Sequence, residues 1–98
     1  MTDIQTLTKE KIKLDEPGLY DVIFLNDDIT TQEFVVRVLK QIFDKTTEQA
    51  MAVMNRVHKD GQGTVGSYVH EIAEQKGIET TLLARQENFP LQVKVKKQ

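Results

Sequence analysis

The segment from Tyr20 to Phe34, which reads YDVIFLNDDITTQEF, constrains the fold more than any other part of this chain. Its first six residues, Tyr20 to Leu25, are apolar almost throughout and rich in β-forming residues, which predicts a buried strand. Thr30 and Glu33 have the spacing of a helix capping box and precede an apolar helical stripe. A strand must therefore turn directly into a helix, and the turn carries Asn26, Asp27 and Asp28.

The size and composition of the chain exclude several classes of function. Its 98 residues suffice for one domain, which buries only about two thirds of the surface of the unfolded chain. The thirteen Lys and Arg are scattered, the net charge is −2, and there are two Tyr, four Phe and no Trp, so we expect no nucleic-acid binding. With no cysteine, a disulfide framework and a zinc–cysteine site are excluded. Neither a signal-peptide core nor a transmembrane run is present, so we expect no membrane association and a cytoplasmic location.

Two helices are predicted to follow the first strand. Residues 31–44 place apolar side chains on one stripe at 3.6-residue spacing. Thr46 and Gln49 form a second capping box, so the next helix should begin near Thr46 or Thr47, and Gly61 supplies its left-handed C-cap. The apolar face of this second helix consists of Ala50, Val53, Met54, Val57 and His58.

The rest of the chain completes a β-α-α-β-α-β order. Residues 64–69 are strand-like, residues 70–87 predict a third helix in which Gly77 costs about 1 kcal/mol relative to Ala, and residues 91–95 alternate as an edge strand after Pro90. This order predicts an α/β (α+β) two-layer sandwich, with a small three-stranded antiparallel sheet and helices on one face. Residues 1–18 are polar and end in Pro17-Gly18, so we expect a flexible extension before a domain over residues 19–98.

Two sequence patterns that can indicate a cofactor or a metal site occur here outside the context that such a site requires. Residues 61–66 fit the dinucleotide fingerprint G-x-G-x-x-G, but a helix precedes them and a strand follows, which is the inverse of the order that this fingerprint needs. His58 and His70 lie twelve residues apart, and this spacing fits no common zinc arrangement. We therefore expect no metal site and no cofactor.

The acceptors at the end of the first strand are open to two interpretations. Residues such as Asn26, Asp27 and Asp28 often form Asx-turns, and Asp28 or Thr30 is a natural cap for the first helix. Alternatively, three acceptors in a row suit the α-ammonium group of a peptide, which donates three hydrogen bonds. His58 is likewise either a buried core histidine or a polar group on an apolar helix face. If the acceptors and His58 converge, they form a polar rim around an apolar hole, which an N-terminal residue with a bulky side chain requires.

Several segments together resemble the ClpS family, whose members carry protein substrates to a bacterial AAA+ unfoldase and its protease. They are NDD-x-T followed by EFV, then MAVMNRVH, HEIAEQK and Pro90-Leu91, and the match covers residues 20–95. The resemblance implies that Asn26, Asp27 and His58 hold the α-amino group of a substrate. It implies a hydrophobic pocket and its mouth at Leu25, Asp28, Thr30, Gln32, Val35, Met54, Val57 and Leu91. It also implies that Glu71 and Lys76 belong to the surface that binds the unfoldase.

The function that this resemblance implies is that of an adaptor and not of an enzyme. It would bind proteins with a free N-terminal Phe, Leu, Tyr or Trp and deliver them to the N-terminal domain of a ClpA- or ClpC-type unfoldase. The chain departs from the family at Gln32, where a methionine is frequent, and at Val69, where a threonine is common. Two alternatives are a factor-binding module like the C-terminal domain of the ribosomal stalk protein, and a small hydrolase using Asp27 and His58, which has no nucleophile in a recognisable motif.

Overall fold

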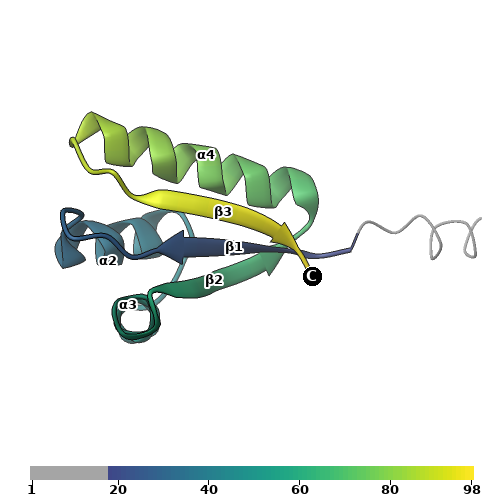
Figure 1. Cartoon of the computed structure of the whole chain (residues 1–98). Coiled ribbons are helices and arrows are strands. Elements are labelled where there is room, and N and C mark those ends of the chain that lie inside the picture. The colour runs from purple at the N-terminus through teal and green to yellow at the C-terminus, as the bar shows by residue number, and fades with distance from the viewer. Residues whose placement is uncertain (1–17) are drawn as a thin grey trace, which may run out of the picture.

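The computed structural model describes residues 18–98, so the predicted N-terminal extension, apart from Gly18, lies outside the described residues. The described residues form an α+β fold with three helices and a three-stranded antiparallel sheet, which confirms the predicted order and architecture (Figure 1). No helix among these residues is long and apolar enough to span a membrane. The elements are β1 (Tyr20–Leu25), α2 (Gln32–Gln41), α3 (Thr47–Asp60), β2 (Gln62–Tyr68), α4 (His70–Gln86) and β3 (Gln92–Lys97).

The sheet has the order β2-β1-β3, with β1 in the centre and antiparallel to both neighbours. The last residue of β1, Leu25, pairs with Gln62 at the start of β2 and with Gln92 at the start of β3. This central position explains why the sequence of β1 is almost entirely apolar, since the side chains of Val22 and Phe24 are fully buried. The predicted edge position of β3 is confirmed, although this strand begins one residue later than expected.

One hydrophobic core lies between the sheet and the helices. Val22 and Phe24 of β1 pack in it with residues from all three helices, and the helical members at or below 1% exposure are Phe34, Val38, Leu39, Ala50, Ala73 and Ala84. Burial of a side chain such as Phe34 or Leu39 contributes about 1.5–3 kcal/mol to stability. Because α2 and α3 are both anchored in this core, the N-terminal end of α2 and the C-terminal end of α3 are held in fixed positions next to the end of β1.

The two predicted capping boxes have different outcomes. At α3 the box is present, because the Thr46 hydroxyl accepts from the Gln49 backbone N–H and the Gln49 side chain accepts from the Thr46 backbone N–H. At α2 the prediction of a Thr30–Glu33 box was wrong. Thr31 is the N-cap, and its hydroxyl accepts from the Phe34 backbone N–H at 3.2 Å. Thr30 lies one residue before the cap, and its hydroxyl donates to Asp27 Oδ2 at 2.8 Å.

The first helix also ends three residues earlier than predicted, at Gln41. Asp44 adopts a left-handed backbone conformation with φ 54°, which an α-helix cannot accommodate. The Lys45 backbone N–H then donates to the Leu39 carbonyl at 3.0 Å, which closes the chain back onto α2. An apolar stripe alone does not reveal such an end, because Ile42 and Phe43 continue to pack against the core outside the helix.

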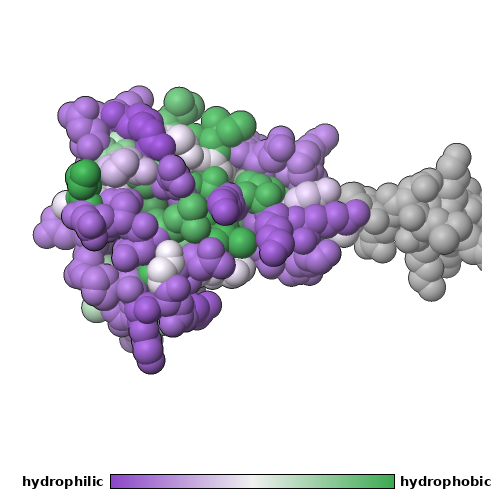
Figure 2. Space-filling view, in the orientation of Figure 1, coloured by the Kyte–Doolittle hydropathy of each residue, from purple (hydrophilic) through white to green (hydrophobic). Residues whose placement is uncertain are grey.

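Helix α4 extends along β3 and passes through Gly77 without interruption (Figure 1). Its N-cap, Val69, makes no side-chain hydrogen bond, as expected of a position that lacks the hydroxyl of threonine. Figure 2 shows that hydrophobic side chains gather where α4 lies beside β3, within a surface that is otherwise mostly hydrophilic. Ile78 and Leu82 are the most exposed α4 members of this patch, at 59% and 60%.

Candidate functional site

The end of β1 is joined directly to the end of α3. The Asn26 backbone N–H donates to the Gly61 carbonyl at 2.9 Å, which extends the β1–β2 pairing by one residue. Gly61 caps α3 with φ 84°, a left-handed conformation that glycine adopts without steric cost, and β2 begins at the next residue. His58, in the last turn of α3, is therefore brought next to the acceptors that follow β1.

These elements enclose a pocket of about 260 Å³. Its apolar lining consists of Val35, Met54 and Val57, which are only 8%, 9% and 6% exposed. Exposed and half-buried polar residues surround them, so the pocket has an apolar floor and a polar rim. The full lining is Asn26, Asp27, Asp28, Thr30, Gln32, Val35, Met54, Val57 and His58. All three residues predicted to hold an α-amino group and six of the eight predicted pocket residues are thus brought together.

The other two predicted pocket residues, Leu25 and Leu91, do not line this pocket. Leu91 is 2% exposed and belongs to the core. Its position is fixed by the Arg85 guanidinium, whose Nη1 donates to the carbonyls of Phe89 at 2.7 Å and Leu91 at 3.0 Å. Leu25 is half-buried at the end of β1. A place for both residues at the pocket or its mouth therefore stays a prediction.

Asp27 organises the turn between β1 and α2. Its Oδ1 accepts from the backbone N–H groups of Ile29 at 2.8 Å and Thr30 at 2.6 Å, and its Oδ2 accepts from the Thr30 hydroxyl at 2.8 Å. Burial alone would raise the pKa of Asp27, but these hydrogen bonds from Thr30 and Ile29, together with the charge of Arg85, outweigh it and hold the pKa below its ordinary value. The Asx-turn interpretation is therefore correct for Asp27, which remains ionised at neutral pH.

The remaining polar groups of the rim are not engaged. Within residues 18–98, the side chains of Asn26, Asp28 and His58 make no hydrogen bond and no ion pair, and all three are exposed. His58 is therefore not a core histidine, and neither Asp28 nor Thr30 caps α2. The Asp27 carboxylate has about four lone-pair sites, of which the turn uses three. An amide, an imidazole and two carboxylates thus face the pocket, which suits a cationic donor group.

The same geometry does not support a hydrolase or a metal site. The carboxylate of Asp27 bonds to Ile29 and Thr30 and not to His58, so the two side chains form no catalytic pair. His70 lies at the start of α4, where its Nε2 is 3.0 Å from Glu74 Oε1 and its ring packs against that of Tyr20 at an interplanar angle of 57°. Among residues 18–98, no three potential metal-ligating side chains come together.

The two residues predicted to contact an unfoldase differ in their environment. Glu71 is exposed in the first turn of α4. The ammonium of Lys76 is instead turned toward the protein, where it donates to the Ile42 carbonyl at 2.6 Å and lies 5.6 Å and 5.3 Å from the ring centroids of Phe43 and Tyr68. Lys76 therefore joins α4 to the segment after α2, a structural role that the sequence did not indicate.

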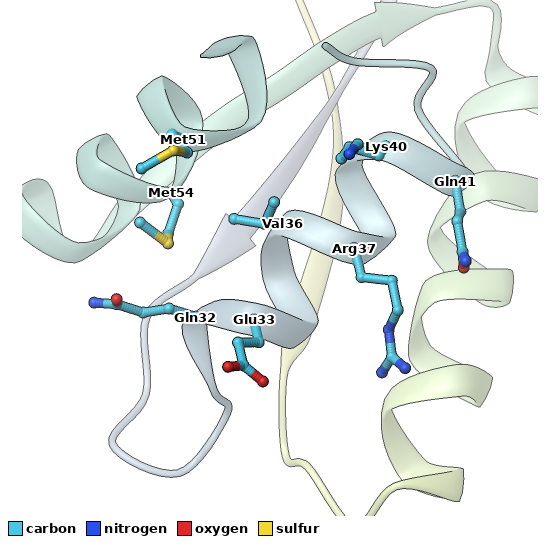
Figure 3. A pocket seen from close by; sticks show the side chains of 8 residues that line it. All are labelled: Gln32, Glu33, Val36, Arg37, Lys40, Gln41, Met51 and Met54. Carbon is cyan, nitrogen blue, oxygen red and sulfur yellow. The ribbon is translucent and has the colours of Figure 1, made fainter. Parts of the chain in front are cut away.

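A second concave surface adjoins the pocket and was not predicted (Figure 3). This α2–α3 groove has a volume of about 480 Å³ and shares Gln32 and Met54 with the pocket. Its other lining residues are Glu33, Val36, Arg37, Lys40, Gln41 and Met51. The sequence signal for this groove is the pair Met51 and Met54, because residues three positions apart are neighbours on a helix surface. In the structure Met54 is buried and Met51 is exposed.

Comparison with known proteins gives consistent results. The chain matches the family model described as ATP-dependent Clp protease adaptor protein ClpS over residues 15–94. It is 43% identical to the ATP-dependent Clp protease adapter protein ClpS of Campylobacter jejuni subspecies doylei, over 97% of this chain and 99% of the relative. It is 51% identical to that of Treponema denticola, over 87% and 84% of the two chains. The structure of Agrobacterium tumefaciens ClpS2 bound to L-phenylalaninamide is similar with a TM-score of 0.81 and 38% identity, covering 84% of this chain and 99% of that one.

Proposed function

This chain belongs to the ClpS family of ATP-dependent Clp protease adaptors, so it is an adaptor and not an enzyme, and we propose that it recognises proteins by a free, bulky hydrophobic N-terminal residue. The preferred residues are Phe, Leu, Tyr and Trp. Family membership removes the two alternatives, a stalk-like factor-binding module and a small hydrolase. The observation that carries the proposal is a single pocket with a buried apolar floor and a rim of unengaged acceptors.

The apolar floor provides affinity for the first side chain. Val35, Met54 and Val57 leave one small pocket into which a single aromatic or branched aliphatic side chain can be inserted. Complete burial of such a side chain contributes about 1.5–3 kcal/mol, or roughly 10- to 150-fold in the dissociation constant. Polar or small first residues gain little from this floor, so they are bound more weakly.

The rim provides the requirement for a free amino group. An α-ammonium donates three hydrogen bonds, and the side chains of Asn26, Asp28 and His58 together with the remaining lone pair of Asp27 offer acceptors for them. A blocked amine has neither the charge nor the three donors, so acceptors would be left unpaired. The A. tumefaciens ClpS2 structure supports this assignment, because L-phenylalaninamide combines a free α-amine with a phenyl side chain.

Delivery requires a second surface, for which we propose the exposed N-terminal turn of α4 around Glu71. Its partner is the N-terminal domain of a ClpA- or ClpC-type unfoldase. Lys76 would contribute by holding α4 against the end of α2, because its ammonium is engaged within the protein. We propose that delivery takes place in the cytoplasm.

Fluorescence anisotropy with labelled peptides tests the recognition step. A Phe-led peptide with a free amine should bind, and its N-acetylated form should bind about 10- to 150-fold more weakly for each charge-assisted hydrogen bond lost. Equal affinities of the two peptides would refute the proposal. A panel with Phe, Leu, Tyr, Trp, Ser and Asp at the first position measures the expected preference.

Degradation of a Phe-led reporter by the partner unfoldase and protease tests delivery. Glu71→Ala should slow degradation, whereas Glu79→Ala, a matched change of another exposed glutamate on α4, should not. Equal rates for the two variants would mean that the turn around Glu71 does not contact the unfoldase.

A further inference from the structure

The α2–α3 groove is an apolar surface that continues from the pocket. Under the function proposed above, the peptide segment that follows the first residue of a substrate is the ligand that can occupy it. Resting on that function, we propose that the groove binds the side chain at position 3 of the substrate and favours an apolar side chain there. The adaptor would then recognise a short N-terminal motif, of which the first residue is only the most deeply inserted part.

Continuity between the two surfaces is the first argument. Gln32 and Met54 line both the pocket and the groove, so no element separates them. Figure 3 shows Met51 and Met54 of α3 on one side of the groove and Gln32 and Val36 of α2 on the other. A segment that leaves the pocket across this shared wall enters the groove directly.

The fixed position of the α-amine is the second argument. The acceptors of Asn26 and His58 hold the amine at the rim, and the first side chain fills the pocket, so the path of the peptide is defined from its first residue. In an extended chain each residue advances about 3.3 Å, and side chains two positions apart point to the same side. The third side chain therefore reaches the surface next to the pocket, about 6.6 Å along the chain.

The lining of the groove explains the expected preference. Val36 is half-buried, Met54 is buried and Met51 is 47% exposed, so the groove offers apolar surface that is accessible to water. Methionine side chains are flexible and polarizable, and they adapt to ligands of different shape. The groove should therefore accept several apolar residues and not one specific side chain.

The charges around the groove do not favour a charged ligand. Arg37 is paired with Glu87, with its Nη2 at 2.6 Å from both carboxylate oxygens. Glu33 and Lys40 carry opposite charges and lie one at each end of the lining segment of α2. By contrast, the exposed apolar groove between α4 and β3 shares no lining residue with the pocket.

The test uses peptides that begin with Phe-Ala and differ only at position 3, measured by fluorescence anisotropy on the full chain. Phe-Ala-Leu peptides should bind about fivefold more tightly than Phe-Ala-Ala peptides, which corresponds to partial burial of the larger third side chain. Met51→Gln, which keeps length and helix propensity, should reduce this ratio toward one. Val36→Thr, a change of similar shape, should reduce it as well.

Leu82→Gln is the matched control, because it makes the same change from an apolar to an amide side chain on an exposed helix position outside both sites. It should leave the ratio unchanged, and circular dichroism should show that all three variants fold. Equal binding of the two peptides to the unmodified chain would overturn the inference, as would a ratio that persists in both Met51→Gln and Val36→Thr. Failure of every free-amine Phe peptide to bind would instead refute the proposed function, and the inference with it.

Discussion

Asp27 has two roles that one substitution can separate. Its carboxylate closes the turn through three hydrogen bonds from Ile29 and Thr30, and it also places a negative charge at the rim of the pocket. Asp27→Asn retains an oxygen for the two backbone N–H groups, and the Thr30 hydroxyl is able to rotate and accept from the new amide. The turn should therefore be kept while the charge is lost.

The magnitude of the effect follows from this difference. Losing a hydrogen bond between charged groups costs about 1.5–3 kcal/mol, so the affinity for a Phe-led peptide should fall about 10- to 150-fold. The free energy of unfolding should fall by only about 1 kcal/mol, because one hydrogen bond is exchanged for another of similar strength. Asp27→Ala removes all three bonds and should lower both quantities.

Fluorescence anisotropy gives the affinity, and thermal unfolding followed by circular dichroism gives the stability. Asp21→Asn is the matched control, since Asp21 is also a carboxylate that accepts hydrogen bonds, from Ser67 and Gln98, and it lies on β1 outside the pocket. It should not change peptide affinity. If Asp27→Asn binds the free-amine peptide as tightly as the unmodified chain, Asp27 is a turn residue only and the charge argument is refuted.

Four further outcomes are expected. Gln32→Met should sharpen the preference for Leu over Ile at the first position by about 1 kcal/mol, which peptide titrations measure; an unchanged ratio means that Gln32 does not touch this side chain. Val69→Thr should supply the missing N-cap of α4 and raise the melting temperature by about 4–8 °C, unlike Val69→Ala. In Gly63→Ala a Cβ would lie 2.9 Å from Val57 Cγ2, so stability should fall by about 1–3 kcal/mol and peptide binding should weaken; unchanged melting and binding would contradict this. Because folding lowers the Asp27 pKa, its contribution to stability is present above the ordinary value of 3.8 and is lost as pH falls below it, so acid melts of Asp27→Asn and the unmodified chain should converge there.

Local sequence signals predicted the elements of this fold well, because each of them depends on residues close together in the chain. The Thr46–Gln49 box, the left-handed Gly61 and the apolar run of β1 all act within a few residues. The Thr30–Glu33 box failed because the next residue, Thr31, is the N-cap of α2. Spacing alone does not show which of two adjacent threonines becomes the cap.

The assembly of the site could be predicted from the sequence only through family resemblance. His58 and Asn26 are 32 positions apart, and they meet because β1 pairs with β2 and Asn26 bonds to the carbonyl of Gly61. No local pattern encodes that pairing. The inward turn of Lys76 and the α2–α3 groove depend in the same way on contacts between elements distant in sequence.

The turn at Asp27 also has a kinetic consequence. Its three hydrogen bonds form within the protein. The free-energy cost of ordering the loop, about 1–2 kcal/mol per residue, therefore arises during folding and not during binding. A ligand then meets a rigid rim, and association proceeds at the ordinary rate of about 10⁵–10⁷ M⁻¹s⁻¹ without waiting for a loop to close. Substrates with different first residues should therefore associate at similar rates and dissociate at different rates. The first side chain of a substrate would then set how long that substrate stays bound and available for transfer.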